Sequence, residues 1–190
     1  MEDLLPILQA KAQDGRYLVV NKGPLAELLQ RSVGDILMNR CPDGATVSIE
    51  VKAEGENKHG NLFLETWSNK SRWTHGWMCS LREATWLWYY FQRERELCVV
   101  AFEALRRWAY TIPGRNGHAG RLWDFPERKQ SKYNQPNDTW GRCVPIAVLV
   151  QESGLRRFFV NGAVVTVAPS SVAEPGLFEN DNWAEEAPVP

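Results

Sequence analysis

Thr46-Val47-Ser48-Ile49-Glu50-Val51-Lys52-Ala53 is the stretch of sequence on which the interpretation of the fold rests. Apolar and polar side chains alternate along it, and this period of two predicts a β-strand with one apolar and one polar face. The polar face carries the carboxylate of Glu50 and the ammonium group of Lys52, two positions apart. Residues 41–44, Cys-Pro-Asp-Gly, are a strong turn signal just before it. The sequence therefore predicts a strand over 46–53 that follows directly after a tight turn.

Two further strands are predicted beside this one. Residues 33–39 alternate with the same period and place Asp35 on the preceding strand, and residues 61–67 predict a third strand. We expect the three strands to form a meander. Residues 3–12 and 24–31 are predicted helices before the first of these strands, each with a proline in its first turn, where the missing N–H group costs little.

The segment after the meander predicts a helix and a strand. Ser80 and Glu83 have the spacing of a capping box, and the aromatic residues that follow predict a buried helix over 81–92. Residues 97–102 form a compact apolar run typical of a buried strand, and residues 103–110 have helical composition. The expected order of the core is helix, three strands, helix, strand.

The C-terminal half is expected to extend this core. Residues 113–142 contain several glycines and prolines and predict a long irregular loop. Residues 144–150 and 157–167 predict additional strands, the second region being a hairpin with a type I′ turn at Asn161-Gly162. The expected fold class is α/β, with a mixed central sheet flanked by helices and with extra C-terminal strands.

Length and charge bound the class of protein. The chain has 190 residues, of which 44% are hydrophobic, and one domain over residues 1–167 is expected. Residues 168–190 hold acids and no basic residue, so an acidic, mobile tail is predicted there. The formal net charge of -1 includes no global basic excess that would indicate a polyanionic partner. Any basic surface must therefore be local.

Cysteine spacing and apolar run lengths indicate the expected location. The four cysteines lie far apart without a CxxC pair, and we expect reduced thiols. No apolar run reaches about 18 residues, and residues 1–15 lack the uninterrupted apolar region of a secretion signal. These features predict a soluble, cytoplasmic protein that does not bind a membrane.

Asp35, Glu50 and Lys52 form the constellation with chemical potential. Period two puts Glu50 and Lys52 on one face of their strand, next to the strand that carries Asp35. Burying two acids and a lysine on a sheet face is costly unless they neutralise one another or bind a cation. Magnesium prefers oxygen ligands and keeps several waters, so two carboxylates and a carbonyl suffice.

This pattern resembles the PD-(D/E)XK nuclease superfamily, whose restriction-endonuclease-like or Holliday-junction-resolvase-like core runs αβββαβ. Asp35 corresponds to the D of the motif, and Glu50-Val51-Lys52 to its ExK. The resemblance covers roughly residues 20–110 and includes the order of the expected elements. One departure is Gly34, which stands where the family usually has proline.

The resemblance implies a role for each residue. Asp35 and Glu50 would ligate Mg²⁺ or Mn²⁺ together with the carbonyl oxygen of Val51, and Lys52 would orient or help to deprotonate the attacking water. Many members add an acid from the first core helix, and Glu27 is the candidate here. The implied reaction is phosphodiester hydrolysis in DNA, with RNA as the less favoured substrate.

Other residues are candidates by position. Glu65 on the third predicted strand could reach the metal or a water, and the alternative is a surface acid paired with Lys70 or Arg72. Basic side chains near aromatic residues suit phosphate contact, and the alternative is a merely solvated loop. The expected nucleic-acid contacts are Lys70, Arg72, Arg115, Arg121, Arg128, Lys129 and Lys132.

A rival interpretation keeps the fold without turnover. In it the chain is a catalytically inactive nuclease-fold module that binds nucleic acid or a protein partner. The tail, with Phe178 and Trp183, could bind such a partner, and a homodimer is a further possibility. The three histidines are not at metal-ligand spacing and are assigned no catalytic role.

Overall fold

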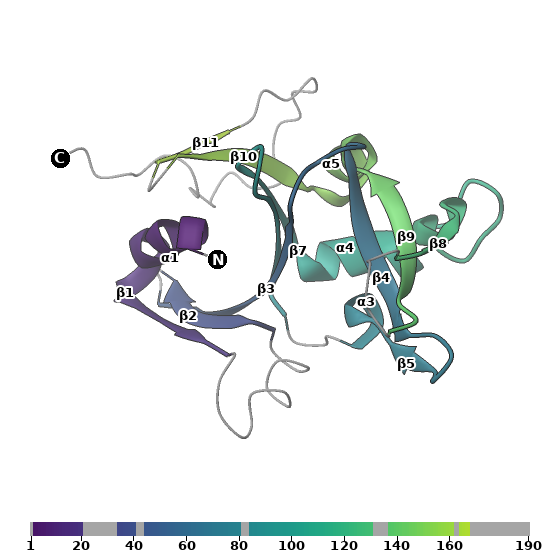
Figure 1. Ribbon diagram of the computed structural model, residues 1–190, viewed down its shortest axis with the longest axis horizontal. Helices are drawn as coiled ribbons and strands as arrows, with labels where there is room; N and C mark the ends of the chain where they lie inside the picture. The colour runs from purple at the N-terminus through teal and green to yellow at the C-terminus, as the bar shows by residue number, and fades with distance from the viewer. Residues whose placement is uncertain are drawn as a thin grey trace.

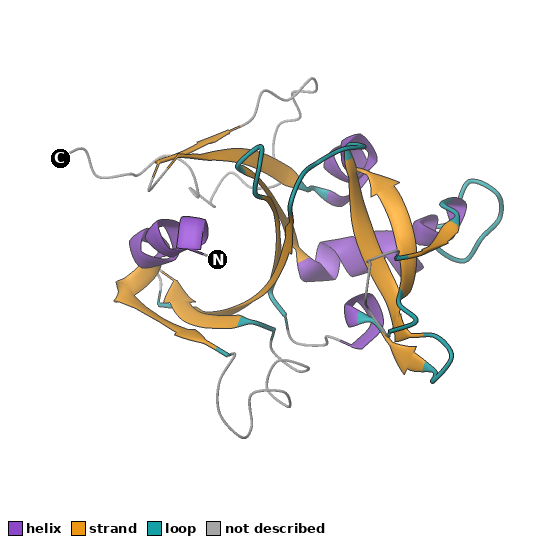
Figure 2. Ribbon diagram, in the orientation of Figure 1, coloured by secondary structure: helices purple, strands orange, loops and turns teal. Residues whose placement is uncertain are grey.

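Two sheets organise the protein in a computed structural model that describes residues 2–20, 34–40, 44–80, 84–130, 137–161 and 164–167 (Figures 1 and 2). The larger sheet is seven-stranded, in the order β1-β2-β3-β6-β7-β10-β11, and the smaller is four-stranded, in the order β5-β4-β9-β8. The strands of the larger sheet are β1 (Ala12–Val19), β2 (Ile36–Arg40), β3 (Thr46–Glu54), β6 (Trp86–Phe91), β7 (Glu96–Ala101), β10 (Arg156–Asn161) and β11 (Val164–Val167). Those of the smaller sheet are β4 (Asn61–Asn69), β5 (Thr74–His75), β8 (Glu127–Lys129) and β9 (Trp140–Pro145).

Helices lie on both faces of the larger sheet, which makes the fold α/β. The helical elements are η1 (Glu2–Leu4), α1 (Leu5–Lys11), α3 (Trp77–Ser80), α4 (Phe102–Tyr110), η2 (Arg121–Asp124) and α5 (Ile146–Ser153). Helix α1 lies inside the curve of the sheet, and α4 lies on the other side (Figure 1). Each side has its own hydrophobic core, because the strands are apolar on both faces.

The strands predicted on either side of residues 41–44 are confirmed, while the predicted turn itself falls on residues 41–43, outside the described ranges. β2 and β3 pair antiparallel, with Ile36 opposite Ile49. The helix predicted over 3–12 is confirmed as η1 and α1, and β7 and α4 confirm the strand and helix predicted over 97–110. β1 was not predicted. The helix predicted over 24–31 lies outside the described residues.

The prediction of a helix over 81–92 is wrong, because residues 86–91 form the strand β6 at the centre of the larger sheet. All six side chains of β6 are buried. Trp86, Trp88 and Tyr90 pack into the core beside α1, while Leu87 and Phe91 pack into the core beside α4. Large aromatic side chains fit this doubly buried strand, and burial on both faces removes the alternation that would have identified it.

The predicted three-stranded meander is wrong in its third member. β4 is a strand, but it pairs with β5 and β9 in the smaller sheet. The neighbour of β3 is β6, which runs parallel to it. Parallel strands require a long crossover, and residues 55–85 supply it, with β4, β5 and α3 on the way.

Residues 113–150 are more regular than predicted. The expected irregular loop contains η2 and β8 and ends in β9, and the strand expected over 144–150 is mostly helix α5. Ile146 and Leu149 bury one face of α5, and Gly154 ends it with φ 74°. A short apolar run cannot be assigned to strand or helix from periodicity alone.

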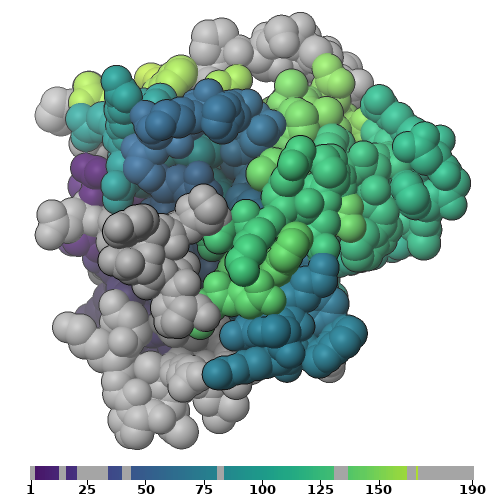
Figure 3. Space-filling view, turned by 45° about the vertical axis from the view of Figure 1, so that its right-hand side comes forward, coloured from purple at the N-terminus to yellow at the C-terminus, as the bar shows by residue number. Residues whose placement is uncertain are grey.

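The C-terminal hairpin is confirmed, since β10 and β11 pair antiparallel with Asn161 opposite Val164. Its turn at 162–163 and the tail at 168–190 lie outside the described residues. Within the described ranges, no helix has both the length and the apolar character needed to span a bilayer. The β4–β5 hairpin lies at the lower right of the described residues in Figure 3.

Candidate functional site

Asp35 is placed against β3 by hydrogen bonds at the start of β2. Its backbone N–H donates to the carbonyl of Ile49 over 2.9 Å. Its carboxylate Oδ2 then accepts a hydrogen bond from the backbone N–H of Val51 over 2.8 Å. The Asp35 side chain thus supplies the hydrogen-bond acceptor that a carbonyl of a neighbouring strand would otherwise provide for the N–H of Val51. This contact brings the carboxylate beside the segment that carries Glu50 and Lys52.

Gly34 allows this close approach of the two strands. Its φ is 89°, a conformation that proline cannot adopt and that other residues rarely adopt. A Cβ atom at this position would lie 3.0 Å from the carbonyl oxygen of Ile49 and 3.1 Å from the backbone nitrogen of Glu50. The departure from the proline of the resembled motif therefore has a local structural cause.

Glu50 is a buried acid, with only 5% of its surface exposed. Its pKa is raised to about 7, chiefly by burial and also by the charges of Asp35 and Glu65, while Lys52 opposes these effects. Lys52 forms an ion pair with Glu50 and is itself half-buried. The structure therefore brings the three residues of the predicted D…ExK constellation together, in an environment that disfavours the charged carboxylate.

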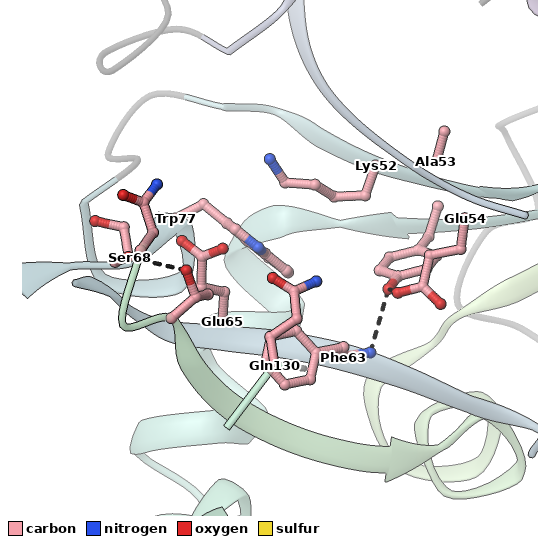
Figure 4. A pocket seen from close by; sticks show the side chains of 11 residues that line it. Lys52, Ala53, Glu54, Phe63, Glu65, Ser68, Trp77 and Gln130 are labelled. Carbon is pink, nitrogen blue, oxygen red and sulfur yellow. Dashed lines mark hydrogen bonds between the residues drawn. The ribbon is translucent and has the colours of Figure 1, made fainter. Parts of the chain in front are cut away.

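A cleft opens next to Lys52, between the larger sheet and the smaller one (Figure 4). Its volume is about 290 Å³. Lys52 and Glu54 lie on one wall, Phe63 and Glu65 lie on the opposite wall, and Trp77 lies between the walls. The ammonium nitrogen of Lys52 is 5.7 Å from the centroid of the Trp77 ring, within the range of a cation–π contact.

Glu65 is held on its wall by two closely approaching glycines. A Cβ atom on Gly76 would lie 2.5 Å from the carbonyl oxygen of Glu65 and 2.7 Å from its Cγ. Gly141 is opposite Glu65 in β9, and a Cβ there would lie 2.9 Å from the Cα of Glu65. The predicted accessory acid thus faces the cleft, close enough to Glu50 for its charge to act on that carboxyl.

Tyr89 and Glu54 are cleft residues that the sequence analysis did not identify. The Tyr89 hydroxyl donates a hydrogen bond to the Glu54 carboxylate and accepts one from the backbone N–H of Phe63 over 3.4 Å. Burial, followed by the charge of Glu54, raises the pKa of Tyr89 far above its ordinary value, so the phenol remains protonated. Tyr89 was hidden because its segment was assigned to a helix.

The donor set around Asp35 fits a divalent cation that keeps part of its water shell. In the described ranges, no three His, Cys, Asp or Glu side chains form a ready-made metal-binding group. Two carboxylates, from Asp35 and Glu50, and the Val51 carbonyl remain the available donors, and magnesium commonly binds through one or two carboxylates. A cation there would also relieve the unfavourable charge on Glu50.

The predicted nucleic-acid contacts fall into different environments. Arg121 is buried, with 6% exposed, and pairs with Asp124 and Glu152, which leaves it little surface with which to contact nucleic acid. The ion pair between Arg121 and Glu152 links η2 to α5. Lys132 and Glu27 lie outside the described residues.

The remaining basic residues reach the surface. Arg72 and Arg128 are exposed. Arg115 and Lys129 are exposed and pair with Glu152 and Asp138, respectively. Lys70, beside β4, forms an ion pair with Glu127.

Comparison with known proteins adds no assignment to this geometry. No protein-family model, no curated protein and no solved structure matches the chain.

Proposed function

We propose that this protein is a metal-dependent nuclease that hydrolyses phosphodiester bonds in DNA. The observation that carries the proposal is the hydrogen bond between Val51 and Asp35, which holds one carboxylate beside the segment of Glu50 and Lys52. The carboxylate of Asp35, the buried carboxyl of Glu50 and the ammonium group of Lys52 are thereby brought together. Of these residues, Lys52 lines the cleft. This is the arrangement that the D…ExK resemblance implies.

The larger sheet supports a restriction-endonuclease-like core, although its segments differ from those expected. The elements α1, β1, β2 and β3 run in order, and α3 and β6 follow once the smaller sheet is set aside. This gives helix, three strands, helix, strand. Asp35 then precedes the second strand, and Glu50 and Lys52 lie on the third, one strand later than predicted.

The residues of the site would divide the chemistry among them. Asp35, Glu50 and the carbonyl of Val51 would hold Mg²⁺ or Mn²⁺, which when bound supplies a water of lowered pKa and neutralises charge on the phosphoryl group. The ammonium group of Lys52 would orient the attacking water and stabilise the developing negative charge. Glu65 faces Lys52 across the cleft and would accept a proton or position a second water.

A cleavage assay tests this proposal. Labelled single-stranded, blunt duplex and branched DNA, and a matched RNA, are incubated with Mg²⁺, Mn²⁺ or EDTA. We expect metal-dependent cleavage by the wild type that falls roughly 100-fold or more in Glu50→Gln and Lys52→Met. Glu103→Gln, at an exposed acid at the start of α4, is the matched control and should cleave normally.

Each other outcome has a definite meaning. Equal cleavage by wild type, Glu50→Gln and Lys52→Met identifies a contaminating activity and overturns the proposal. Binding without cleavage in either metal supports the inactive nuclease-fold module instead. Cleavage of RNA alone retains the mechanism and changes the substrate.

A further inference from the structure

Trp73 is the most exposed large apolar side chain in the described part of the chain, with 77% of its surface accessible. It lies in the turn between β4 and β5. Its φ is 56°, in the left-handed region that bulky residues rarely adopt. A tryptophan is thus presented to solvent at a position where its backbone is strained.

Hydrogen bonds hold the turn in this conformation. The backbone N–H of Trp73 donates to the carbonyl of Lys70 over 3.1 Å, and the N–H of Lys70 donates to the carbonyl of Asp138 over 2.8 Å. The Asn69 side-chain oxygen accepts from the backbone N–H of Arg72 over 3.1 Å. Strained backbone that is fixed by its surroundings is concentrated at functional sites. The turn therefore presents Trp73 in a set orientation.

The surroundings of Trp73 are aromatic and cationic. Its ring meets Trp67 edge to face, with centroids 5.7 Å apart and an interplanar angle of 82°. Trp67 is stacked on His75, with centroids 4.8 Å apart and planes at 20°. Arg72 is exposed next to it. An exposed indole that is followed along the hairpin by other aromatic rings and preceded by an exposed arginine is suited to a planar base attached to a phosphate.

The hairpin and the wall of the cleft belong to the same strand. Glu65 and Ser68 of β4 line the cleft, and Trp67 lies between them in sequence. At the base of the hairpin, the backbone N–H of Gly76 donates to the carbonyl of Thr66 over 2.8 Å. The strand that forms one wall of the cleft therefore continues directly into the aromatic hairpin.

We propose that Trp73 stacks on an unpaired nucleobase, so that the preferred substrate carries a single-stranded segment beside the bond to be cut. This inference rests on the proposed nuclease function and defines its substrate class. Bases inside a duplex are already stacked and do not offer a free face, whereas those of a tail, flap or frayed end do. With a formal net charge of -1, the protein has no global excess of positive charge for binding duplex backbones, which makes a stacking contact more important.

Binding in EDTA tests the inference without requiring cleavage. DNA duplexes with a single-stranded tail that contains 2-aminopurine, and blunt duplexes with the same paired sequence, are titrated with the full chain. We expect fluorescence quenching of the tail by the wild type. Trp73→Ala should weaken binding of the tailed duplex by roughly ten-fold, and Trp73→Phe should restore most of it, because base–aromatic stacking tolerates a change of ring.

Phe159 provides the matched control, because it is an exposed aromatic residue (40%) on β10 of the other sheet. Phe159→Ala should bind both duplexes as the wild type does. Unchanged binding by Trp73→Ala, or an equal loss for tailed and blunt duplexes, overturns the inference. An equal loss in Phe159→Ala overturns it as well.

Failure of this inference is distinguishable from failure of the nuclease proposal. If the wild type cleaves DNA and Trp73→Ala cleaves tailed DNA equally well and binds it equally tightly, only the stacking role is wrong. If Trp73 is needed for binding the tail but no nucleic acid is cut in either metal, only the nuclease proposal is wrong. Trp73 is then a stacking residue of a binding module.

Discussion

The backbone N–H of Val51 donates a hydrogen bond to the carboxylate of Asp35, although the two residues are separated by 16 positions in the chain. The bond has two consequences. It satisfies a backbone donor of β3 next to the start of β2, and it holds a carboxylate at a fixed place beside Glu50. The structural and the proposed chemical roles of Asp35 can therefore be separated by substitution.

Asp35→Asn should retain the fold and lose activity. The amide oxygen can still accept the Val51 hydrogen bond, but it lacks the charge that a metal ligand needs. Asp35→Ala removes the acceptor as well and should lower the free energy of unfolding by about 1–2 kcal/mol. Urea unfolding in EDTA measures this difference, and cleavage in Mg²⁺ should be lost in both variants. An active Asp35→Asn would remove Asp35 from the metal site.

The metal-free protein should lose stability as pH rises from about 4.5 to about 7. The pKa of Glu50 is about 7 in the folded chain against an ordinary 4.5, so the folded state holds the proton more tightly in this interval. The free energy of unfolding therefore falls with rising pH, by roughly 3 kcal/mol for this group, and stays low above pH 7. Urea unfolding in EDTA at pH 4, 6 and 8 measures the loss.

Glu50→Gln isolates this contribution from those of other titrating groups. The amide does not ionise, so below pH 4.5 the free energy of unfolding of the variant should be equal to that of the wild type or lower by a pH-independent amount. By pH 8 the variant should be the more stable of the two proteins. Adding Mg²⁺ at pH 8 should stabilise the wild type and not the variant. Parallel pH profiles for the two proteins would contradict the raised pKa of Glu50.

Removing Lys52 should raise the pKa of Glu50 above about 7. The ammonium charge and its hydrogen bond both lower the pKa of that carboxyl in the wild type, and Lys52→Met removes both. Titration of the glutamate side-chain carbon signals by NMR, with Glu50 identified from Glu50→Gln, gives the value directly. A pKa that falls or stays the same in Lys52→Met would show that the two groups do not interact.

Gly76→Ala should disturb the cleft wall. The added methyl would lie 2.5 Å from backbone of Glu65 and 2.7 Å from its side chain, so the strand must shift. We expect a loss of cleavage activity of roughly ten-fold or more together with a fall in stability of about 1–3 kcal/mol. Gly55→Ala is the matched control, since no atom lies within 4 Å of the added Cβ. Normal cleavage activity in Gly76→Ala would show that the position of Glu65 does not matter for catalysis.

Trp73→Gly should leave the stability of the protein close to that of the wild type. Glycine adopts φ 56° without strain, and this gain offsets the lost edge-to-face contact with Trp67 and the greater freedom of the unfolded chain. Thermal unfolding should show a midpoint within about 4 °C of the wild type. A much larger fall would mean that Trp73 is primarily a packing residue.

Asp35, Glu50 and Lys52 could be grouped from the sequence because their positions follow from local chemistry. Residues 41–44 carry a turn signal between two short alternating segments, and an antiparallel pair with a short connection has few possible registers. Glu65 was identified as a candidate, but as a member of the same sheet. It belongs to β4 in the smaller sheet and approaches the site from the opposite wall.

Burial on two faces hid other parts of the site. The apolar run of β6 contains no alternation of polar and apolar residues, so the capping pattern at Ser80 and Glu83 favoured a helix. Because its segment was predicted to be helical, Tyr89 was not recognised as a residue of the cleft. Arg121 was taken for a phosphate contact because a basic residue in a glycine-rich segment is usually solvated. Its partners Asp124 and Glu152 include one that is 31 positions away, beyond the reach of a local pattern.

Short-range alternation and turn chemistry were thus enough to specify the β2–β3 pair and the acids and lysine that it carries. The partner of β3, the second sheet and the cleft between them depended on tertiary contacts. β6 pairs with β3 after the crossover of residues 55–85, and β4 pairs with β9, which lies about 70 residues later in the chain. The reason is physical: alternation reports which face of a strand is buried, whereas strand pairing depends on packing between distant segments.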